Sequence, residues 1–370
     1  MISYFVGSSK HSLWCLFFRN MADQTSVNRL TVDGCHPVNT SVHAFFILIY
    51  SLVFLVGLLL NSFTMKFYFC RTHHRVSSSL TVYLKNLTAA DFLLCLSLPI
   101  RITNYASSST TILQLHCSIG IPVLYFNMYT SILFMGYIAA NRYLKIIHPS
   151  GTHMLQTVRA AKILSGITWA CLLAPTISFI ITFFITQKPQ ISDLRHCDSV
   201  FSASASLLGK GIHTCLGIIF LVVLISLVFF YYNTSHRVLL AQQRRFSSSN
   251  SKKLVKSRKN MLLLVCVFCV CFIPYHLVRL PYIFLLNSHS LVSVVLFYLN
   301  EVTIMISVFN VCLDPLIYCF LCKAFRAQVN LRMPSRFAQI NIQPVNKERK
   351  SSEEQLDTLT PVTMIQTSEL

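Results

Sequence analysis

Charged side chains are scarce in this chain, and their scarcity excludes an ordinary soluble domain. Only 12% of the 370 residues are Asp, Glu, Lys or Arg, and 54% are hydrophobic. A soluble globular protein carries roughly a quarter charged residues. Together with a mean hydropathy of +0.59, these values indicate a membrane protein.

Acidic residues are scarcer than basic ones, which raises the question of a nucleic-acid partner. Lys and Arg number 31 against 12 Asp and Glu, so the formal net charge is +19. Most of the basic residues, however, lie in short segments between apolar runs, where they set the orientation of membrane spans. We therefore expect no nucleic-acid partner.

Several catalytic and transport patterns are also missing. The 14 cysteines show no CxxC pairing with histidines at ligand spacing, so the sequence predicts no metal site. No nucleophile–base cluster lies inside the apolar runs, and we expect no enzymatic activity. The second half does not repeat the first, which counts against a transporter built from inverted repeats. A transporter nevertheless stays the alternative, because Asp91 and Asp314 place acids inside apolar runs.

What the chain does contain is seven apolar stretches, each long enough to cross a bilayer. They cover residues 43–69, 81–102, 118–147, 160–186, 207–232, 260–286 and 291–321. Basic residues concentrate in alternate connections, which places the N-terminus outside and the C-terminus inside. We predict an all-α membrane protein with a seven-transmembrane helix bundle at 43–322. An extracellular segment (1–42) precedes it, and a short amphipathic eighth helix on the membrane surface (323–333) and a disordered cytoplasmic tail (334–370) follow.

Polar residues inside the second, third and seventh stretches suggest an interior ion site. A carboxylate far from either end of a span is costly, and so it is usually functional or paired. Hard oxygen ligands suit a cation such as Na⁺. The residues that could surround one hydrated cation are Asp91, Asp314, Asn310, Asn127 and Ser131. The alternative is a hydrogen-bonded network in which one acid is protonated.

The sixth stretch combines a kink with a cation near the outer mouth. Pro274 lies in the helix interior and should bend the helix. His276 and Arg279 follow at a spacing of three and share one face. An arginine in a partly dry site attracts an anion, but an ion pair with Glu301 explains Arg279 equally well.

A series of short motifs is spread along the seven stretches. In chain order these are Gly57-Leu-Leu-Leu-Asn61, Leu87 to Asp91, Cys117, Asn141-Arg142-Tyr143, Trp169, Pro274 and Asp314-Pro315-x-x-Tyr318. Together they resemble the class A (rhodopsin-like) G-protein-coupled receptors. More narrowly, the chain is similar to the purinergic branch activated by ADP and UDP-sugars, which also contains lysophosphatidylserine receptors and orphans. The segments that carry this similarity include Tyr83 to Asn86, Leu98 to Ile102, Tyr125 to Ile132, Cys271 to Arg279 and Asn310 to Tyr318.

The resemblance implies a pocket for an extracellular anionic ligand, either a nucleotide or a lysophospholipid. Its ligand-binding positions match Arg279, His276, Tyr125, Tyr129, Tyr282 and, at the rim, Arg101. It also implies a disulfide between Cys117 and Cys197. The positions that rearrange, or that face a heterotrimeric G protein of the inhibitory class, match Arg142, Tyr143, Tyr231, Phe268, Phe272, Pro274 and Tyr318.

The chain departs from this family pattern at four places. Asn300-Glu301 stands where the nucleotide receptors usually carry Lys-Glu, which removes one phosphate-binding cation and is closer to the lysophosphatidylserine type. Asn141 replaces the usual Asp, so raised basal signalling is expected. Cys35 lacks its usual partner cysteine. The fifth stretch lacks its usual helix-bending residue, so the alignment supports His213 as a pocket residue only weakly.

The two ends carry processing and partner motifs. We expect a plasma-membrane protein. The apolar patch at 13–18 is too short for the core of a signal peptide, so we expect no cleaved signal. Met21 is an alternative start. Asn39 begins a glycosylation acceptor. Cys319 and Cys322 are either palmitoylation sites or buried thiols. Tail serines and threonines suggest arrestin as a partner, and the terminal Ser368-Glu369-Leu370 has the form of a PDZ-domain ligand.

Overall fold

The computed structural model describes residues 40–71, 78–147, 153–186, 197–243, 248–285, 291–321 and Phe325. The chain divides into two compact units, Met1–Ala44 and Phe45–Leu370. Of the first unit, the structure describes only the start of one helix. The following description concerns the second unit.

Helices account for nearly all of the described residues, and no strand occurs among them. In chain order the longer helices are α2 (Thr40–Met65), α3 (Ser79–Ala106), α5 (Ile121–Ile147), α6 (Val158–Ile185), α8 (Ala203–Gln243), α9 (Ser248–Leu285), α10 (Leu291–Val308) and α11 (Asn310–Leu321). The short elements are η1 (Lys66–Arg71), α4 (Thr110–Leu115), η3 (His116–Gly120), η4 (Met154–Gln156) and α7 (Cys197–Val200). The elements η1 and η3 are π-helical turns that continue α2 and precede α5.

Seven helical spans in the described part of the chain are long and apolar enough to cross a membrane. They are Val42–Phe69, Ser79–Ala106, Thr110–Ile147, Val158–Ile185, Ala203–Leu240, Leu254–Ile283 and Val295–Tyr318. Each one contains most of a predicted stretch, so the all-α, seven-span prediction is confirmed. The predicted surface helix at 323–333 lies outside the described residues except for Phe325, which is helical.

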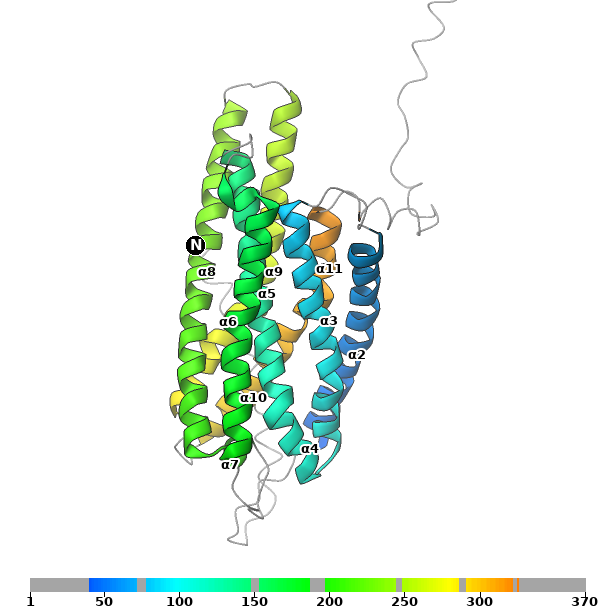
Figure 1. Ribbon diagram of the computed structural model, residues 1–370, viewed down its shortest axis with the longest axis vertical. Helices are drawn as coiled ribbons and strands as arrows, with labels where there is room; N and C mark the ends of the chain where they lie inside the picture. The colour runs from blue at the N-terminus through cyan, green and yellow to red at the C-terminus, as the bar shows by residue number, and fades with distance from the viewer. Residues whose placement is uncertain are drawn as a thin grey trace, which may run out of the picture. The chain divides into compact units, whose positions relative to one another are not determined.

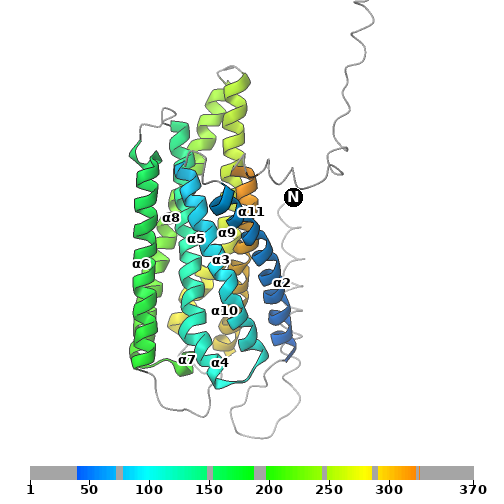
Figure 2. The same ribbon diagram turned by 45° about the vertical axis from the view of Figure 1, so that its right-hand side comes forward.

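The third span is the centre of the bundle, as Figures 1 and 2 show from two sides. In its most apolar window 78% of the residues are buried, against 22% for the first and fourth spans. α5 packs against α3, α6, α8 and α9. Large apolar side chains instead point outward from the peripheral spans; Leu59, Leu207 and Leu277 are each at least 70% exposed. An apolar outer surface of this kind is what contact with lipid requires.

The seventh span is divided into two helices at Phe309. α10 ends at Val308, Phe309 forms a turn, and α11 begins at Asn310. Pro315 in α11 has no backbone N–H, so the carbonyl of Val311, four residues earlier, lacks its helical donor. The side-chain amide of Asn61 on α2 donates to this carbonyl at 2.9 Å. A polar group of one helix thus replaces the hydrogen bond that a proline removes from another.

Gly57 permits the same two helices to approach closely. A methyl group at Gly57 would lie 2.6 Å from Cγ1 of Val311 and 3.0 Å from the sulfur of Cys95. Asn61 also donates to the carbonyl of Gly57, at 2.9 Å. The Gly57-to-Asn61 segment therefore serves as the contact surface of α2 for α11.

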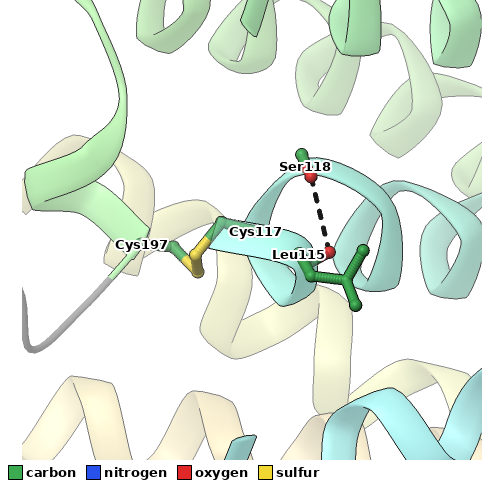
Figure 3. Close-up of a disulfide and its surroundings, with 4 residues drawn as sticks. All are labelled: Leu115, Cys117, Ser118 and Cys197. Carbon is green, nitrogen blue, oxygen red and sulfur yellow. Dashed lines mark hydrogen bonds between the residues drawn. A yellow bond between two sulfur atoms is a disulfide. The ribbon is translucent and has the colours of Figure 1, made fainter. Parts of the chain in front are cut away.

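The two ends of the bundle differ, and we name them by their features. At one end, Cys117 of η3 is joined to Cys197 of α7, with 5.4 Å between the Cα atoms; Figure 3 shows this bridge. Phe183 and Val200 are buried beside it. The predicted disulfide is confirmed, and we call this the disulfide end. At the other end, α8 and α9 extend beyond their neighbours (Figure 1), and we call it the hairpin end.

Several predictions concern residues that the structure does not describe. They are the extracellular segment with Cys35 and glycosylation at Asn39, the alternative start at Met21, the surface helix except Phe325, Cys322, and the tail with its arrestin and PDZ motifs. These stay predictions.

Candidate functional site

Arg279 lies at the centre of a cluster of aromatic rings near the disulfide end of α9. Its guanidinium carbon is 5.3 Å from the ring centre of Tyr125 on α5 and 5.2 Å from that of Tyr282 on α9. Both tyrosines are largely buried. An arginine between two rings keeps its charge while losing water, and so it is a strong partner for an anion.

His213 of α8 completes this cluster. Arg279 donates to its Nε2 at 3.0 Å. A guanidinium group can only donate, so Nε2 must be the acceptor and Nδ1 carries the hydrogen. Nδ1 is buried and has no hydrogen-bond partner among the described residues. The ring also packs edge-on against Tyr125, with 4.6 Å between ring centres.

His213 therefore belongs to the cluster, although the sequence supported it only weakly. The family's usual bend is missing from the fifth span, and α8 is continuous over 41 residues. Without that bend, motif matching could not fix the register of α8. The only signal for His213 in the sequence was a polar, hydrogen-bonding side chain inside the apolar fifth stretch.

His276 and Tyr129 contact each other, one turn nearer the hairpin end than Arg279. The hydroxyl of Tyr129 lies 3.0 Å from Nε2 of His276, and Nδ1 lies 2.8 Å from the carbonyl oxygen of Phe272. Because a carbonyl only accepts, Nδ1 carries the hydrogen and Tyr129 donates to Nε2. The ring also stacks on Phe220 of α8, with centroids 3.6 Å apart. Both ring nitrogens are thus used inside the protein, and contact of either residue with a ligand stays a prediction.

Arg101 of α3 forms a buried ion pair with Glu301 of α10, at 2.6 Å. Arg101 also contacts the hydroxyl of Tyr105 at 3.4 Å and lies over the ring of Tyr50, and Tyr105 donates to Glu301. The sequence left open an ion pair between Glu301 and Arg279, but the ion pair of Glu301 is with Arg101. Instead of an exposed cation at a rim, Arg101 is a buried and paired one.

The predicted ion-site residues lie on the hairpin side of the Arg279 cluster, though they do not all bond to one another. Asp91 accepts from Tyr318 at 3.2 Å and from Ser131 at 3.5 Å. Asn310 donates to Asp314 at 3.0 Å. The side chain of Asn127 donates only to Val123 of its own helix among the bonds described, at 2.8 Å. A small cavity beside this group is lined in part by Ser131, Asn310 and Phe272.

The predicted switch residues connect α5 to its neighbours at the hairpin end. Arg142 donates to the carbonyl oxygen of Leu321 at 2.7 Å, where α11 ends. Tyr143 stacks on Phe230 of α8, with centroids 4.9 Å apart. Its stacking partner is thus the residue just before the predicted switch residue Tyr231. Asn141, which stands where the family has an acid, donates to Ser79 of α3 at 2.8 Å.

The remaining switch residues lie deeper in the bundle. Phe268 and Phe272 contact edge-on at 5.3 Å, and both are buried. Pro274 lies inside α9, two residues after Phe272. Ser307 of α10 donates to the carbonyl of Cys271 at 2.8 Å, just before the proline. This polar contact near Pro274 therefore ties α9 to the seventh span, and a bend at Pro274 stays a prediction.

The comparisons with known proteins agree with this architecture. A family model described as the 7 transmembrane receptor (rhodopsin family) matches residues 61–318. G-protein coupled receptor 87 of mouse is 32% identical over 335 residues, which cover 87% of this chain and 90% of that protein. Purinoceptor 14 of cattle is 31% identical, over 80% of this chain and 87% of the relative. Purinoceptor 13 of rat is 30% identical, with the same two coverages.

These matches favour a receptor over the transporter that the sequence left as an alternative. The match spans all of the motifs quoted above from Asn61 to Tyr318, and the curated relatives are covered almost along their whole length. The seven spans and the disulfide between Cys117 and Cys197 agree with it. The chain therefore belongs to the rhodopsin family of seven-transmembrane receptors, in the branch that resembles the purinoceptors.

Proposed function

We propose that this receptor binds an extracellular, phosphate-bearing anion at the Arg279 cluster and responds by activating a heterotrimeric G protein of the inhibitory class. One observation carries the proposal. A permanently charged guanidinium is held between Tyr125 and Tyr282 and bonded to a neutral His213, so the cluster is rich in hydrogen-bond donors.

Two ligand classes fit this cluster. The first is a nucleotide or nucleotide sugar, since relatives at about the same identity are named purinoceptors. The second is a lysophospholipid such as lysophosphatidylserine, because Asn300 offers no charge where the nucleotide receptors usually carry lysine. Tyrosine rings could stack on a base or pack along an acyl chain, so both classes remain proposals.

The orientation of the receptor in the membrane follows from the positions of its basic residues and of its disulfide. Five basic residues occupy the first turns of α9 at the hairpin end: Lys252, Lys253, Lys256, Arg258 and Lys259. This end is cytoplasmic by the positive-inside rule. The disulfide end then faces the oxidising exterior, where such bonds persist. We place the receptor in the plasma membrane with the N-terminus outside and Arg142 toward the G protein.

The acidic group below the pocket supports a second proposal, a site for one hydrated Na⁺-like cation. Asp91 and Asp314 are both fully buried and interact electrostatically, and two such acids call for a proton or a cation that offsets their charge. Oxygens of Asp314, Asn310 and Asn127 are buried without a hydrogen-bond partner among the described residues. Such orphaned oxygens are the ligands that a hard cation prefers.

The function is tested by a G-protein activation screen with ADP, UDP-glucose and lysophosphatidylserine, run on the wild type and on Arg279→Ala. We expect one ligand class to activate the wild type and the variant to lose at least about tenfold in potency, since a charge-assisted contact contributes about 1.5–3 kcal/mol.

Arg159→Ala serves as the matched control, because Arg159 is an exposed arginine at the start of α6 at the hairpin end. Its potency should equal that of the wild type at equal surface expression. A ligand that activates Arg279→Ala and the wild type at the same concentration would show that Arg279 is not the anion anchor.

A further inference from the structure

Lys85 is a charged residue inside the second span that the proposed function does not use. It lies six residues after Ser79, where α3 begins, and so about 9 Å along the helix axis from that end. The span has 28 residues and a length of about 42 Å, which exceeds a hydrocarbon core of about 30 Å by about 6 Å at each end. The Cα atom of Lys85 is therefore just inside the hydrocarbon region at the hairpin end.

Lys85 lies on the lipid-facing side of α3. Ala89, Leu93 and Leu96 follow it at intervals of four, eight and eleven residues, which share one side of an α-helix. Leu93 is 42% exposed and Leu96 is 53% exposed, whereas Leu84 is buried. Because the Cα–Cβ bonds of a helix tilt toward its N-terminus, the side chain of Lys85 leans toward the hairpin end, where the membrane surface lies.

The ammonium group of Lys85 lies over an exposed aromatic ring. Its Nζ atom is 5.7 Å from the ring centre of Phe69, which belongs to η1 and is 48% exposed. The two helices concerned, α2 with its continuation η1 and α3, run side by side in both views (Figures 1 and 2). An aromatic ring offsets less free energy than an ammonium group loses on leaving water. Phe69 alone thus does not account for a lysine at this depth.

Among the described residues, no carboxylate lies at the hairpin end to pair with Lys85. The acids in those ranges are Asp91, Asp198, Glu301 and Asp314. Asp91 and Asp314 are fully buried inside the bundle, Asp198 follows the disulfide cysteine Cys197, and Glu301 is paired with an arginine near the other end of α3. The anions that a membrane supplies at this depth are the phosphates of its lipid headgroups.

We propose that Lys85 and the ring of Phe69 form a binding site for the headgroup phosphate of an anionic phospholipid in the leaflet at the hairpin end. The acyl chains lie along the side of α3 that Ala89, Leu93 and Leu96 line. Phosphatidylcholine carries a cation beside its phosphate, which repels the ammonium group, so the site favours a headgroup without a cation, such as that of phosphatidylinositol. Only the choice of leaflet rests on the proposed function: by the orientation given there it is the cytoplasmic one, which is rich in anionic lipids.

The test is native mass spectrometry of the purified full-length receptor in detergent, with phosphatidylinositol and phosphatidylcholine at equal concentration. The measured quantity is the ratio of the two lipids in the receptor that carries one bound lipid. The variants are Lys85→Gln, which removes the charge, and Lys85→Arg, which keeps it. Lys162→Gln is the matched control, because Lys162 is an exposed lysine near the start of α6, at the same end of the bundle.

We expect Lys85→Gln to lower the ratio of bound phosphatidylinositol to bound phosphatidylcholine about fivefold, which is the contribution of one lysine to the attraction of anionic lipid at a membrane surface. Lys85→Arg and Lys162→Gln should keep the wild-type ratio. The proposal is overturned if Lys85→Gln leaves the ratio unchanged, as a lysine that only stacks on Phe69 would. It is also overturned if Lys162→Gln lowers the ratio equally, because the preference then belongs to the basic surface as a whole.

Glycerophosphoinositol, the same headgroup without acyl chains, distinguishes a lipid site from a site for a soluble anion. It should not displace the bound lipid at equal concentration, and displacement would overturn the lipid assignment. Both lipids reach every surface of a solubilised receptor, so the result does not depend on the orientation in the membrane. Arg279→Ala should keep the wild-type ratio. If Arg279→Ala lowers the ratio and Lys85→Gln does not, the lipid site is wrong while the proposed anion site stands.

Discussion

Gly57 shows how a single hydrogen atom sets the distance between two helices. Its Cα faces Val311 of α11, and a methyl group there would overlap Cγ1 of that valine. Valine cannot turn away easily, because its branched side chain has one preferred rotamer in a helix. The hydrogen bonds from Asn61 to Gly57 and Val311 then hold the close approach in place.

Replacing Gly57 with alanine should therefore destabilise the receptor. We expect a loss of about 1–3 kcal/mol from overpacking, which exceeds the small gain that alanine gives in a helix. The measurement is the midpoint of thermal inactivation of the detergent-solubilised protein.

Gly166 on α6 provides the matched control, since a methyl group there would meet nothing within 4 Å. Gly166→Ala should be neutral or stabilising by up to about 1 kcal/mol. Adding Val311→Ala should recover part of the loss in Gly57→Ala. Equal losses in Gly57→Ala and Gly166→Ala would show that the contact is not as tight as described.

At this scale the sequence identified residues better than it identified their partners. Arg279, Tyr125 and Tyr282 were predicted for one site and do lie together. The partner of Glu301 could not be chosen, because Arg101 and Arg279 lie on different spans and the choice depends on how those spans rotate. His213 needed the register of α8, which no local motif defines.

Among the elements, α5 and α9 are linked by a hydrogen bond in the middle of the bundle. Tyr129 donates to His276, and Phe220 of α8 covers the histidine ring. Along α9 this contact lies between Arg279 and Pro274, only two residues after the proline. Any movement of α9 relative to α5 must lengthen or break it.

The link can be tested by a double-mutant cycle with Tyr129→Phe and His276→Phe. Phenylalanine at 276 preserves an aromatic ring against Phe220 but removes both ring nitrogens. Because one hydrogen bond is shared, the two losses of thermal stability should not add; the coupling should be about 0.6 kcal/mol and at most about 1.7 kcal/mol.

Tyr137→Phe is the control for this cycle. It removes a hydrogen bond of similar length, 3.0 Å, to Thr168 on α6, which does not involve His276. Its effect should add to that of His276→Phe. A coupling near zero between positions 129 and 276 would contradict the assigned hydrogen bond.

The helices themselves were predictable because each one is a long apolar run. The structure extends several of them beyond the apolar core, however. The third span begins at Thr110, eight residues before the predicted start, and the fifth continues past Tyr232 to Gln243. Hydropathy identifies the part of a helix that can lie in the hydrocarbon core of a membrane. It does not predict the polar turns that continue the helix beyond that core.

For the molecule as a whole, the disulfide between Cys117 and Cys197 closes a loop of 80 residues that includes α5 and α6. Removing both cysteines as Cys117→Ser/Cys197→Ser should cost about 2–4 kcal/mol and lower the amount of receptor at the cell surface. The measurements are surface labelling and the thermal midpoint.

Cys171→Ser is the matched control, because Cys171 is an exposed free cysteine on α6. It should retain wild-type surface labelling and thermal stability. Unchanged stability in the double serine variant would mean that the bridge does not constrain the disulfide end.

The seven spans followed from length and hydropathy alone. Their orientation, which rests on the positions of the basic residues, stays a prediction. The division of the seventh span could not be predicted in the same way. Pro315 indicated that one backbone hydrogen bond of that helix is missing, but the turn lies six residues earlier, at Phe309. Its position depends on contacts with α2, α3 and α9, which come from distant parts of the chain.

The turn at Phe309 gives the two halves of the seventh span different attachments. α10 is fixed to α3 by Glu301 and to α9 by Ser307, whereas α11 is fixed to α2 by Val311 and to α3 by Tyr318. Helical hydrogen bonds still cross this turn, from Phe309 to Met305 at 3.3 Å and from Leu313 to Phe309 at 3.2 Å. We therefore expect a displacement of α10 to load its contacts with α3 and α9 first, and to reach α11 only through the few bonds that cross Phe309.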